Sequence, residues 1–497
     1  MIDTFLLINL FKQEAINKLE MANENVLSAR YATPEINEIF SETGKIIAER
    51  NLWIAVMKAQ SKLGLDIPAE DIDKYEKAKL NVDLKLIKEI EHRTRHDVKA
   101  KIEAFVQTAG AGQYLHIGMT SRDLTDNVEQ KQFLNVARII FGRNISVLRH
   151  MIDNSMKYAN HVITARTHNQ PAQPTLLGRR FSMWAEELAL NLRSFEFFLE
   201  NYPLRGIKGP VGTQFDMLTL FGGENKKVEA LEKVVAGKLG FKKVLFSPGQ
   251  VYPRSLDYKL LNHIAQISSA SENFAKTMRL MAGFGLVDEG FEEGQTGSSA
   301  MPYKMNTRSC ERICGLAELL KMYSDGSSRI SGDQWQEGDV SCSVIRRVII
   351  PDAFYAVDGL CETTLTVLNN MHVYGEEIIR ELDKYLPFMA TTELLQKAVQ
   401  KGVGREDAHE AIKRNAIAEA TRMKNQGSLQ NNLPDLLATE SVFVNAGITR
   451  EDIEKIFNDK RHFIGNAYEQ IAAVVEDASG LLQKYAKDAK YEPRAIL

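Results

Sequence analysis

Cysteine is scarce in this chain of 497 residues, and its four cysteines form neither a disulfide scaffold nor a metal site. A large chain with so few cysteines is not held together by disulfides, which is typical of proteins in a reducing cytoplasm. Cys310 and Cys314 are separated by three residues, but no second pair follows at the spacing of a zinc site. We therefore expect a cytoplasmic protein without a structural metal.

An excess of charge of either sign is also absent. The chain has 62 Lys and Arg against 65 Asp and Glu, a net charge of −3, with both signs interspersed. This balance argues against a nucleic-acid-binding or membrane-surface protein, although it does not exclude a local basic pocket. The most apolar early run, FLLINLF, is far too short to span a bilayer, so we expect no transmembrane segment.

Sequence signatures of nucleotide binding and of a hydrolase serine are missing as well. The chain has no P-loop and no G-x-S-x-G nucleophile elbow. The stretch GFGLVDEG (283–290) lacks both the glycine spacing and the preceding strand of a dinucleotide site. We expect no cofactor.

Proline and strand-like stretches are few, and the dominant pattern is that of long helices. From Ser121 to Asn160 the chain has no proline, and its apolar residues recur mostly at helical spacing. Two further stretches, 175–202 and 255 to about 284, behave alike, and helices of this length belong in an elongated bundle. We predict an all-α protein with an N-terminal helical region (1–119), a central long-helix bundle (120–371) and a C-terminal region of shorter helices (372–497). Two stretches, 206–213 and 241–246, are either short strands or loops.

The segment GQTGSSAMPYKMNTRSCE (294–311) stands out in a helical chain. Its glycines Gly294 and Gly297 allow a mobile loop. The sequence after Pro302 predicts a helix, so Lys304 and Asn306 lie at or just before its N-terminus. Free N–H groups and the helix dipole favour an anion there. The segment is therefore either an anion site or simply a loop rich in helix-capping residues.

Two segments further upstream contain polar clusters. In RTRHDV (93–98), His96 lies four residues after His92, so both would share a helix face. No third ligand completes a recognisable metal motif and two arginines would repel a cation, so a polar site lined by Arg95 and His96 is favoured over a metal. In HIGMTSRD (116–123), Thr120 and Ser121 precede the first long helix. Ser121 suits an N-cap, and a cap and an anion site are compatible there.

Two other segments contain acid–base and anion-binding side chains. His168 in ARTHNQPAQPT (165–175) lies between two long helices beside two prolines, and a loop histidine is a candidate general acid or base. Ser343 and Arg347 are four residues apart on a predicted helix, so both would point the same way. That pair either binds a phosphate or belongs to an ordinary exposed turn.

Taken together, these segments resemble the fumarase/aspartase superfamily of lyases and, within it, the adenylosuccinate lyase family. GSSAMPYKMN (297–306) is similar to the long superfamily signature G-S-S-x-M-P-x-K-x-N, and HIGMTSRD and ARTHNQPAQPT resemble two further blocks in the family's order. SARYATPE (28–35), TRHDV (94–98) and SVIRR (343–347) resemble the segments that distinguish this family from its relatives. Beyond residue 372 the resemblance rests on length and helical character.

The resemblance implies a β-elimination that cleaves a C–N bond of succinyl-purine nucleotides and releases fumarate. It implies Ser298 as the base, His168 as the acid and His96 as an assisting residue, with Glu311 orienting His168 or Lys304. Further implied contacts are to the succinyl carboxylates (Thr120, Ser121, Lys304, Asn306), to the phosphate (Arg30, Tyr31, Ser343, Arg347) and to other parts of the substrate (Arg95, Asp97, Thr167, Gln214, Arg254, Ser299, Met301, Arg312). A neighbouring Lys304 and a helix N-terminus would stabilise the serine alkoxide.

The resemblance also implies a homotetramer with active sites shared between three chains, and no metal or cofactor. Thr307 stands where the family commonly has proline, and the first 27 residues extend beyond the shared pattern. The alternatives are another fumarate-releasing lyase, of the argininosuccinate lyase or aspartase type, or a non-catalytic helical scaffold.

Overall fold

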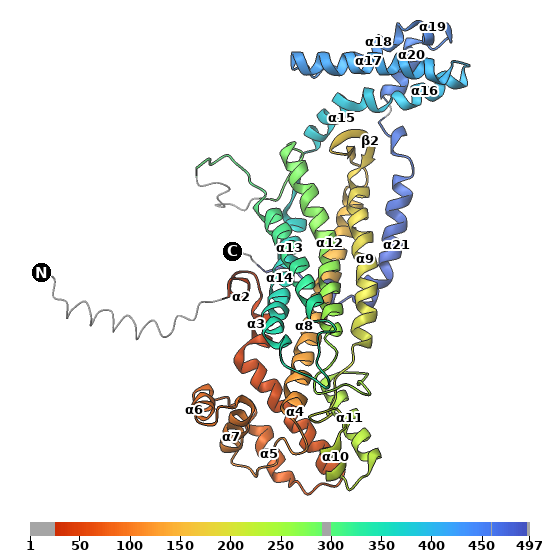
Figure 1. Ribbon diagram of the computed structural model, residues 1–497. Coiled ribbons are helices and arrows are strands. Elements are labelled where there is room, and N and C mark those ends of the chain that lie inside the picture. The colour runs from red at the N-terminus through yellow and green to blue at the C-terminus, as the bar shows by residue number, and fades with distance from the viewer. Residues whose placement is uncertain (1–24, 291–299, 459, 495–497) are drawn as a thin grey trace, which may run out of the picture.

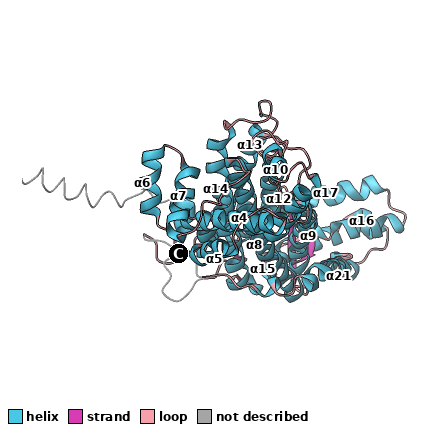
Figure 2. Cartoon of the chain, turned by 90° about the horizontal axis from the view of Figure 1, so that it is seen from below, coloured by secondary structure: helices cyan, strands magenta, loops and turns pink. Residues whose placement is uncertain are grey.

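The computed structural model describes residues 25–290, 300–458 and 460–494, and most of them are helical (Figure 1). Five long helices run side by side through the molecule: α8 (Ser121–Lys157), α9 (Leu177–Asn201), α12 (Ser255–Gly283), α13 (Arg308–Ile330) and α14 (Cys342–Asn370). Seen from one end (Figure 2), α8 lies among the other long helices. The predicted all-α fold with a central long-helix bundle is confirmed.

The central helix α8 is covered by neighbours along its length. It packs on α4, α9, α14 and α21, and even its polar residues Asn127, Gln130 and Asn144 are buried. Large aromatic side chains such as Phe181, Phe274 and Phe354 fill the space between the long helices. At 1.5 Å per residue, the 37 residues of α8 span about 55 Å. Groups at its two ends are therefore far apart.

Most of the shorter helices cluster at the end where α8 begins, whereas α2 (Val26–Arg30) lies beside the middle of α14 (Figure 1). The others are α3 (Pro34–Phe40), α4 (Glu42–Lys62), α5 (Ala69–Ala78), α6 (Leu84–Thr94), α7 (Asp97–Ala109), α10 (Phe215–Leu220) and α11 (Asn225–Leu239). Arg50 of α4 fixes this end from inside. Its buried guanidinium donates to the carbonyls of Ala78, Lys79 and Asn81 at 2.8–3.2 Å and so satisfies the end of α5.

Two small antiparallel sheets interrupt the helices. The hairpin of β1 (Val162–Thr167) and β2 (Gln170–Leu176) follows α8, and β3 (Val287–Asp288) pairs with β4 (His372–Val373). The hairpin was not predicted, because prolines at 171 and 174 disfavour a strand unless its edge is open. The stretches 206–213 and 241–246, which the sequence left open as strands or loops, are both loops. An isolated bridge between Leu204 and Val244 involves only the second of them.

The C-terminal region contains two kinds of structure. Its elements are α15 (Gly375–Met389), α16 (Thr391–Gln400), α17 (Arg405–Gln426), α18 (Leu433–Ala438), α19 (Ser441–Asn445), α20 (Arg450–Asn458), η2 (His462–Ile464), α21 (Ala467–Lys484) and η3 (Asp488–Lys490). Helices α16 to α20 share a small core of their own, whereas α21 returns and packs along α9 (Figure 1). The three-region boundaries stay a prediction. Among the described helices, none combines the length and apolarity needed to cross a bilayer.

Candidate active site

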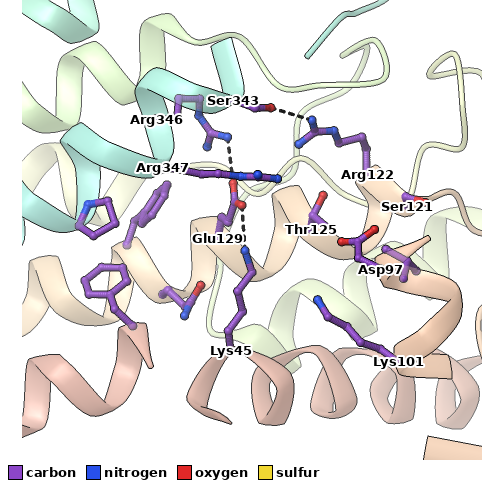
Figure 3. Close-up of a pocket in the computed structure, with 15 residues that line it drawn as sticks. Lys45, Asp97, Lys101, Ser121, Arg122, Thr125, Glu129, Ser343, Arg346 and Arg347 are labelled. Carbon is purple, nitrogen blue, oxygen red and sulfur yellow. Dashed lines mark hydrogen bonds and ion pairs between the residues drawn. The ribbon is translucent and has the colours of Figure 1, made fainter. Parts of the chain in front are cut away.

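Polar side chains from four helices enclose a cavity of about 320 Å³ where α8 and α14 begin (Figure 3). Its lining residues are Phe40, Lys45, Asp97, Val98, Lys101, Ser121, Arg122, Thr125, Glu129, Gln132, Phe133, Ser343, Arg346, Arg347 and Pro351. Four predicted substrate contacts, Asp97, Ser121, Ser343 and Arg347, are therefore brought together although they lie far apart in the sequence.

Three helices start at this cavity. Asp97 is the first residue of α7, Ser121 the first of α8 and Ser343 the second of α14. Unpaired N–H groups and the dipole make a helix N-terminus favourable for an anion. Ser343 and Arg347 lie one turn apart on α14 and both line the cavity, as their spacing predicts. The site is suited to a negatively charged ligand.

The start of α8 is held by a buried carboxylate. Thr120, in extended conformation, is the N-cap instead of the expected Ser121, and its N–H donates to Asp123 Oδ2 at 2.8 Å. Asp123 is buried, forms an ion pair with Arg205 and accepts from the N–H groups of Lys208 and Gly209 at 2.7 and 3.1 Å. This loop also holds the predicted contact Gln214, half-buried, with its side chain donating to Ile207 O at 3.0 Å.

A buried ion network supports the cavity wall. Arg346 donates from Nε to Asp257 Oδ2 at 2.7 Å and from Nη1 to Glu129 Oε2 at 2.9 Å. Lys45 Nζ lies 3.2 Å from the other oxygen of Glu129. Burial opposes ionisation of Glu129, but the charges of Arg346 and Lys45 outweigh it and lower the pKa of its carboxyl. Glu129 is therefore a carboxylate that fixes two cations of the lining.

The predicted contact Arg254 lies behind this wall. Its buried Nη2 is 3.2 Å from Asp126 Oδ2, and its guanidinium lies 4.4 Å from the centre of the Tyr252 ring. It is not part of the cavity lining. Arg254 therefore contacts Asp126 and Tyr252 and does not face the cavity.

The corner between α6 and α7 differs from the sequence prediction. Arg95 is left-handed, with φ 55°, and ends α6, so His92 and His96 do not share a helix and the prediction of a common face is wrong. His96 is the N-cap of α7, and its Nδ1 accepts from the N–H of Lys99 at 3.3 Å. The sequence around Arg95 has no glycine, so nothing in it signalled a left-handed residue.

Sequence reasoning missed several residues of this site. Arg122 directly follows the predicted Ser121 and could have been found from that position. Lys45 and Lys101 come from other helices and have no sequence signal that links them to α8 or α14. His116, beside the start of α8, was also given no role. Trp53 Nε1 donates to its Nδ1 at 3.0 Å, and burial lowers the pKa of its imidazole.

A second group of predicted residues gathers where α2 meets α13. The guanidinium of Arg312 lies 5.5 Å from the centre of the Tyr31 ring, and Arg30 is exposed beside it in sequence. The predicted residues that precede or begin α13 are exposed except for half-buried Asn306: Met301, Lys304, Asn306 and Glu311. The predicted base Ser298 and its neighbour Ser299 lie outside the described residues.

The N-terminus of α13 does hold an anion, and that anion belongs to the chain itself. Glu289, which is buried, accepts from the N–H of Ser309 at 3.0 Å and from the N–H of Cys310 at 2.6 Å. This carboxylate occupies the N–H groups that one of the two sequence interpretations left for a bound anion. Lys304 and Asn306 stay candidates through their side chains.

The third group lies on the β1–β2 hairpin. Thr167 pairs with Gln170, so His168 and Asn169 form a two-residue turn, and both have positive φ, 50° and 60°. Such turns favour Asn-Gly, and an exposed histidine there carries a backbone cost. Arg166 holds this turn, because its Nη1 donates to Asn169 O at 3.2 Å and its Nη2 forms an ion pair with Glu381 of α15.

Within one chain these groups do not form one site. The cavity lies at the start of α8, whereas His168 lies on the hairpin that follows its other end, about 55 Å away along the helix (Figure 1). The predicted catalytic roles therefore stay predictions.

Comparison with protein families gives two matches. Residues 30–319 match the model described as Lyase, and residues 387–474 match the model described as Adenylosuccinate lyase C-terminus. A protein of Saccharomyces cerevisiae named adenylosuccinate lyase is 34% identical over 466 residues, which cover 93% of this chain and 96% of that protein. A protein of the same name from Schistosoma mansoni is 33% identical over 451 residues, with 90% and 93% coverage.

Solved structures share the fold at lower identity. A 3-carboxy-cis,cis-muconate lactonizing enzyme from Pseudomonas putida has a TM-score of 0.78 at 19% identity, covering 93% of this chain and 100% of that one. A fumarate lyase from a Mesorhizobium species has a TM-score of 0.76 at 18% identity, covering 90% and 98%. At these identities the likeness concerns the fold alone.

Proposed function

Because this chain belongs to the adenylosuccinate lyase family, we propose that it cleaves succinyl-purine nucleotides by β-elimination. Adenylosuccinate would give AMP and fumarate, and the succinylaminoimidazole-carboxamide ribotide would give the corresponding carboxamide and fumarate. In each case a base removes a proton from the carbon next to a carboxylate. The electron pair forms the double bond of fumarate, the C–N bond breaks and the nitrogen receives a proton.

The observation that carries this proposal is the cation-lined cavity at three helix N-termini. Its substrates would carry a phosphate and two carboxylates, and Ser121, Ser343 and Arg347 meet there. Arg347 has no hydrogen-bond or ion-pair partner among the described residues, so its charge is available to a ligand. This favours a phosphorylated substrate over those of an argininosuccinate lyase or an aspartase.

The catalytic roles are those that the resemblance to the family implies. Ser298 would take the proton and His168 would return one to the leaving nitrogen. Lys304 and Asn306 would stabilise the carboxylate on which charge develops, and one well-placed donor of this kind contributes about 10²–10³ in rate. His96 would assist in binding.

We further propose that copies of the chain assemble into a homotetramer, because the groups needed for one reaction lie at opposite ends of one chain. Exposed apolar side chains support this. Met183, Leu190 and Phe197 recur every seven residues on α9, and Val344, next to Ser343 of the cavity, is 72% exposed. Apolar stripes of this kind on helices mark contact surfaces. The cytoplasmic location stays a prediction, supported by four buried, unpaired cysteines.

The direct test is to mix the purified protein with adenylosuccinate and follow fumarate by NMR. Ser298→Ala should reduce turnover about a hundredfold or more with the oligomer intact, whereas Ser328→Ala, a half-buried serine near the other end of α13, should change nothing. Fumarate from argininosuccinate or aspartate but not from the nucleotides would assign the alternative lyases. No fumarate from any of them would favour a non-catalytic scaffold.

A further inference from the structure

Arg122 bridges the two helices that begin at the cavity. It is the second residue of α8, and its Nη2 donates to Ser343 Oγ of α14 at 3.0 Å (Figure 3). Its Nη1 lies 3.2 Å from Asp126 Oδ1 within α8. The side chain is 15% exposed, so the guanidinium is largely enclosed yet lines the cavity.

Most other cations of the lining have carboxylates of their own. Lys45 and Arg346 share Glu129, Arg346 also binds Asp257, and Lys101 Nζ lies 2.8 Å from Glu49. These charges are largely neutralised within the protein. Binding a ligand anion through them would require breaking an ion pair.

The side of the cavity around Ser343 is different. Asp126 is shared by Arg122 and Arg254, so one negative charge serves two guanidinium groups. Arg347 adds a charge that has no partner among the described residues. Arg122, Arg254 and Arg347 thus have a single ion-pair carboxylate, Asp126, between them. Asp97, the other acidic residue of the lining, lies four residues before Lys101 on α7 and shares its face.

A phosphate monoester matches this local charge. It carries about −1.5 to −2 at neutral pH and has three strong acceptor oxygens, whereas a carboxylate carries one charge. In the bond from Arg122 to the neutral hydroxyl of Ser343 only the donor is charged, whereas in a bond to phosphate both partners would be charged. Thr125, one turn along α8, has a buried hydroxyl oxygen without a hydrogen-bond partner among the described residues. Burying an unpaired hydroxyl costs free energy, and a hydrogen bond to a ligand oxygen would remove that cost.

We propose that Arg122 binds the phosphate group of the substrate together with Ser343 and Arg347, and thereby selects phosphorylated substrates over phosphate-free ones. The inference rests on the proposed function and adds a specificity residue to it. On binding, Nη2 moves its hydrogen bond from Ser343 to a phosphate oxygen, while Nη1 keeps Asp126.

The experiment compares two substrates, adenylosuccinate and its phosphate-free nucleoside succinyladenosine. Arg122→Met should raise KM for the nucleotide about 10- to 100-fold, the effect of losing a hydrogen bond to a charged group, and leave kcat/KM for the nucleoside unchanged. Arg122→Lys, which keeps the charge, should restore part of the affinity. Inorganic phosphate should inhibit the wild type competitively and the Met variant more weakly, while inhibition by fumarate stays the same.

Folding is a minor concern for this variant, since Asp126 keeps Arg254 as its partner when Arg122 is removed. Arg138→Met is the matched control, because Arg138 lies on α8 outside the cavity and donates to Gly240 O at 3.3 Å. An equal loss on both substrates, or a weaker inhibition by fumarate, would assign Arg122 to the carboxylates and overturn the proposal. Unchanged kinetics would overturn it as well. If the wild type releases no fumarate, the proposed function fails. Calorimetry with inorganic phosphate then tests the inference separately: weaker binding to Arg122→Met than to the wild type supports it, and equal binding overturns it.

Discussion

Mixing two inactive variants should restore activity if the active site is shared between chains. The two substitutions are His168→Ala, on the hairpin beyond the far end of α8, and Arg347→Ala, at the cavity beside its start. Each variant alone should be nearly inactive, because every site lacks either the proposed acid or a proposed phosphate contact. Neither change affects a buried residue, so both variants should fold.

The size of the recovery follows from the geometry. The two residues are separated by about 55 Å along α8, so in the proposed assembly a substrate in the cavity of one chain would meet His168 of another. After subunits mix at random in equal amounts, half of the chains carry an intact His168 and half an intact Arg347. About one quarter of the sites then contain both, since the two residues of each site come from independent chains.

The assay is fumarate release after the two variants have been mixed under conditions that exchange subunits, with exchange verified by mass spectrometry of tagged chains. A mixture of His168→Ala and His168→Gln is the control and should stay inactive, because no chain in it has the histidine. If subunits exchange and the first mixture also stays inactive, the two residues act within one chain, and the reasoning from the length of α8 is refuted.

Two further predictions concern residues that hold the site. Arg166→Gln should lower kcat about 10- to 100-fold with little change in KM, because the guanidinium ties the His168 turn to Glu381. Arg166→Lys should recover part of the lost kcat. Steady-state kinetics at several pH values measure both effects. Glu129→Gln should lower the free energy of unfolding at pH 7 by about 3 kcal/mol, since it leaves buried cations unpaired. The lowered pKa of Glu129 means that its contribution is present above the unfolded pKa and is lost as the pH falls through the folded one. Urea unfolding between pH 7 and pH 3 should therefore be less acid-sensitive in the variant.

The long helices could be predicted because their signals are local. Absence of proline and an apolar residue every three to four positions suffice to define a helix such as α8, whatever surrounds it. The same holds for Ser343 and Arg347, which share a helix face because of their spacing alone. Where the local signal was misleading, the prediction failed. The prolines of β2 concealed the hairpin, and a left-handed Arg95 separated His92 from His96.

The composition of the cavity wall could not be predicted in the same way. Lys45 and Lys101 line it, yet each belongs to a helix whose position depends on packing and not on the sequence nearby. Their carboxylate partners are equally remote: Glu129 is 84 residues from Lys45, and Glu49 is 52 residues from Lys101. A cation in the sequence is available to a ligand only if no such partner reaches it, and that is decided by the tertiary structure. Arg347 and Lys101 are both cations in the sequence, but Lys101 has an ion-pair partner, Glu49, and Arg347 has none among the described residues.

At the start of α13, too, a partner from elsewhere in the chain decides whether a binding group is available to a ligand. Its N–H groups attract a negative charge as the sequence predicts, but Glu289 supplies that charge from within the chain. With the helix N-terminus already neutralised, charge developing on a substrate carboxylate has to be met by side chains, and Lys304 and Asn306 are the donors just before that helix. At the starts of α8 and α14, by contrast, Arg122 and Arg254 share Asp126, and Arg347 has no ion-pair partner among the described residues. In the proposed reaction, the phosphate would bind at the starts of α8 and α14, whereas His168 would have to come from another copy of the chain, because the length of α8 separates it from that cavity.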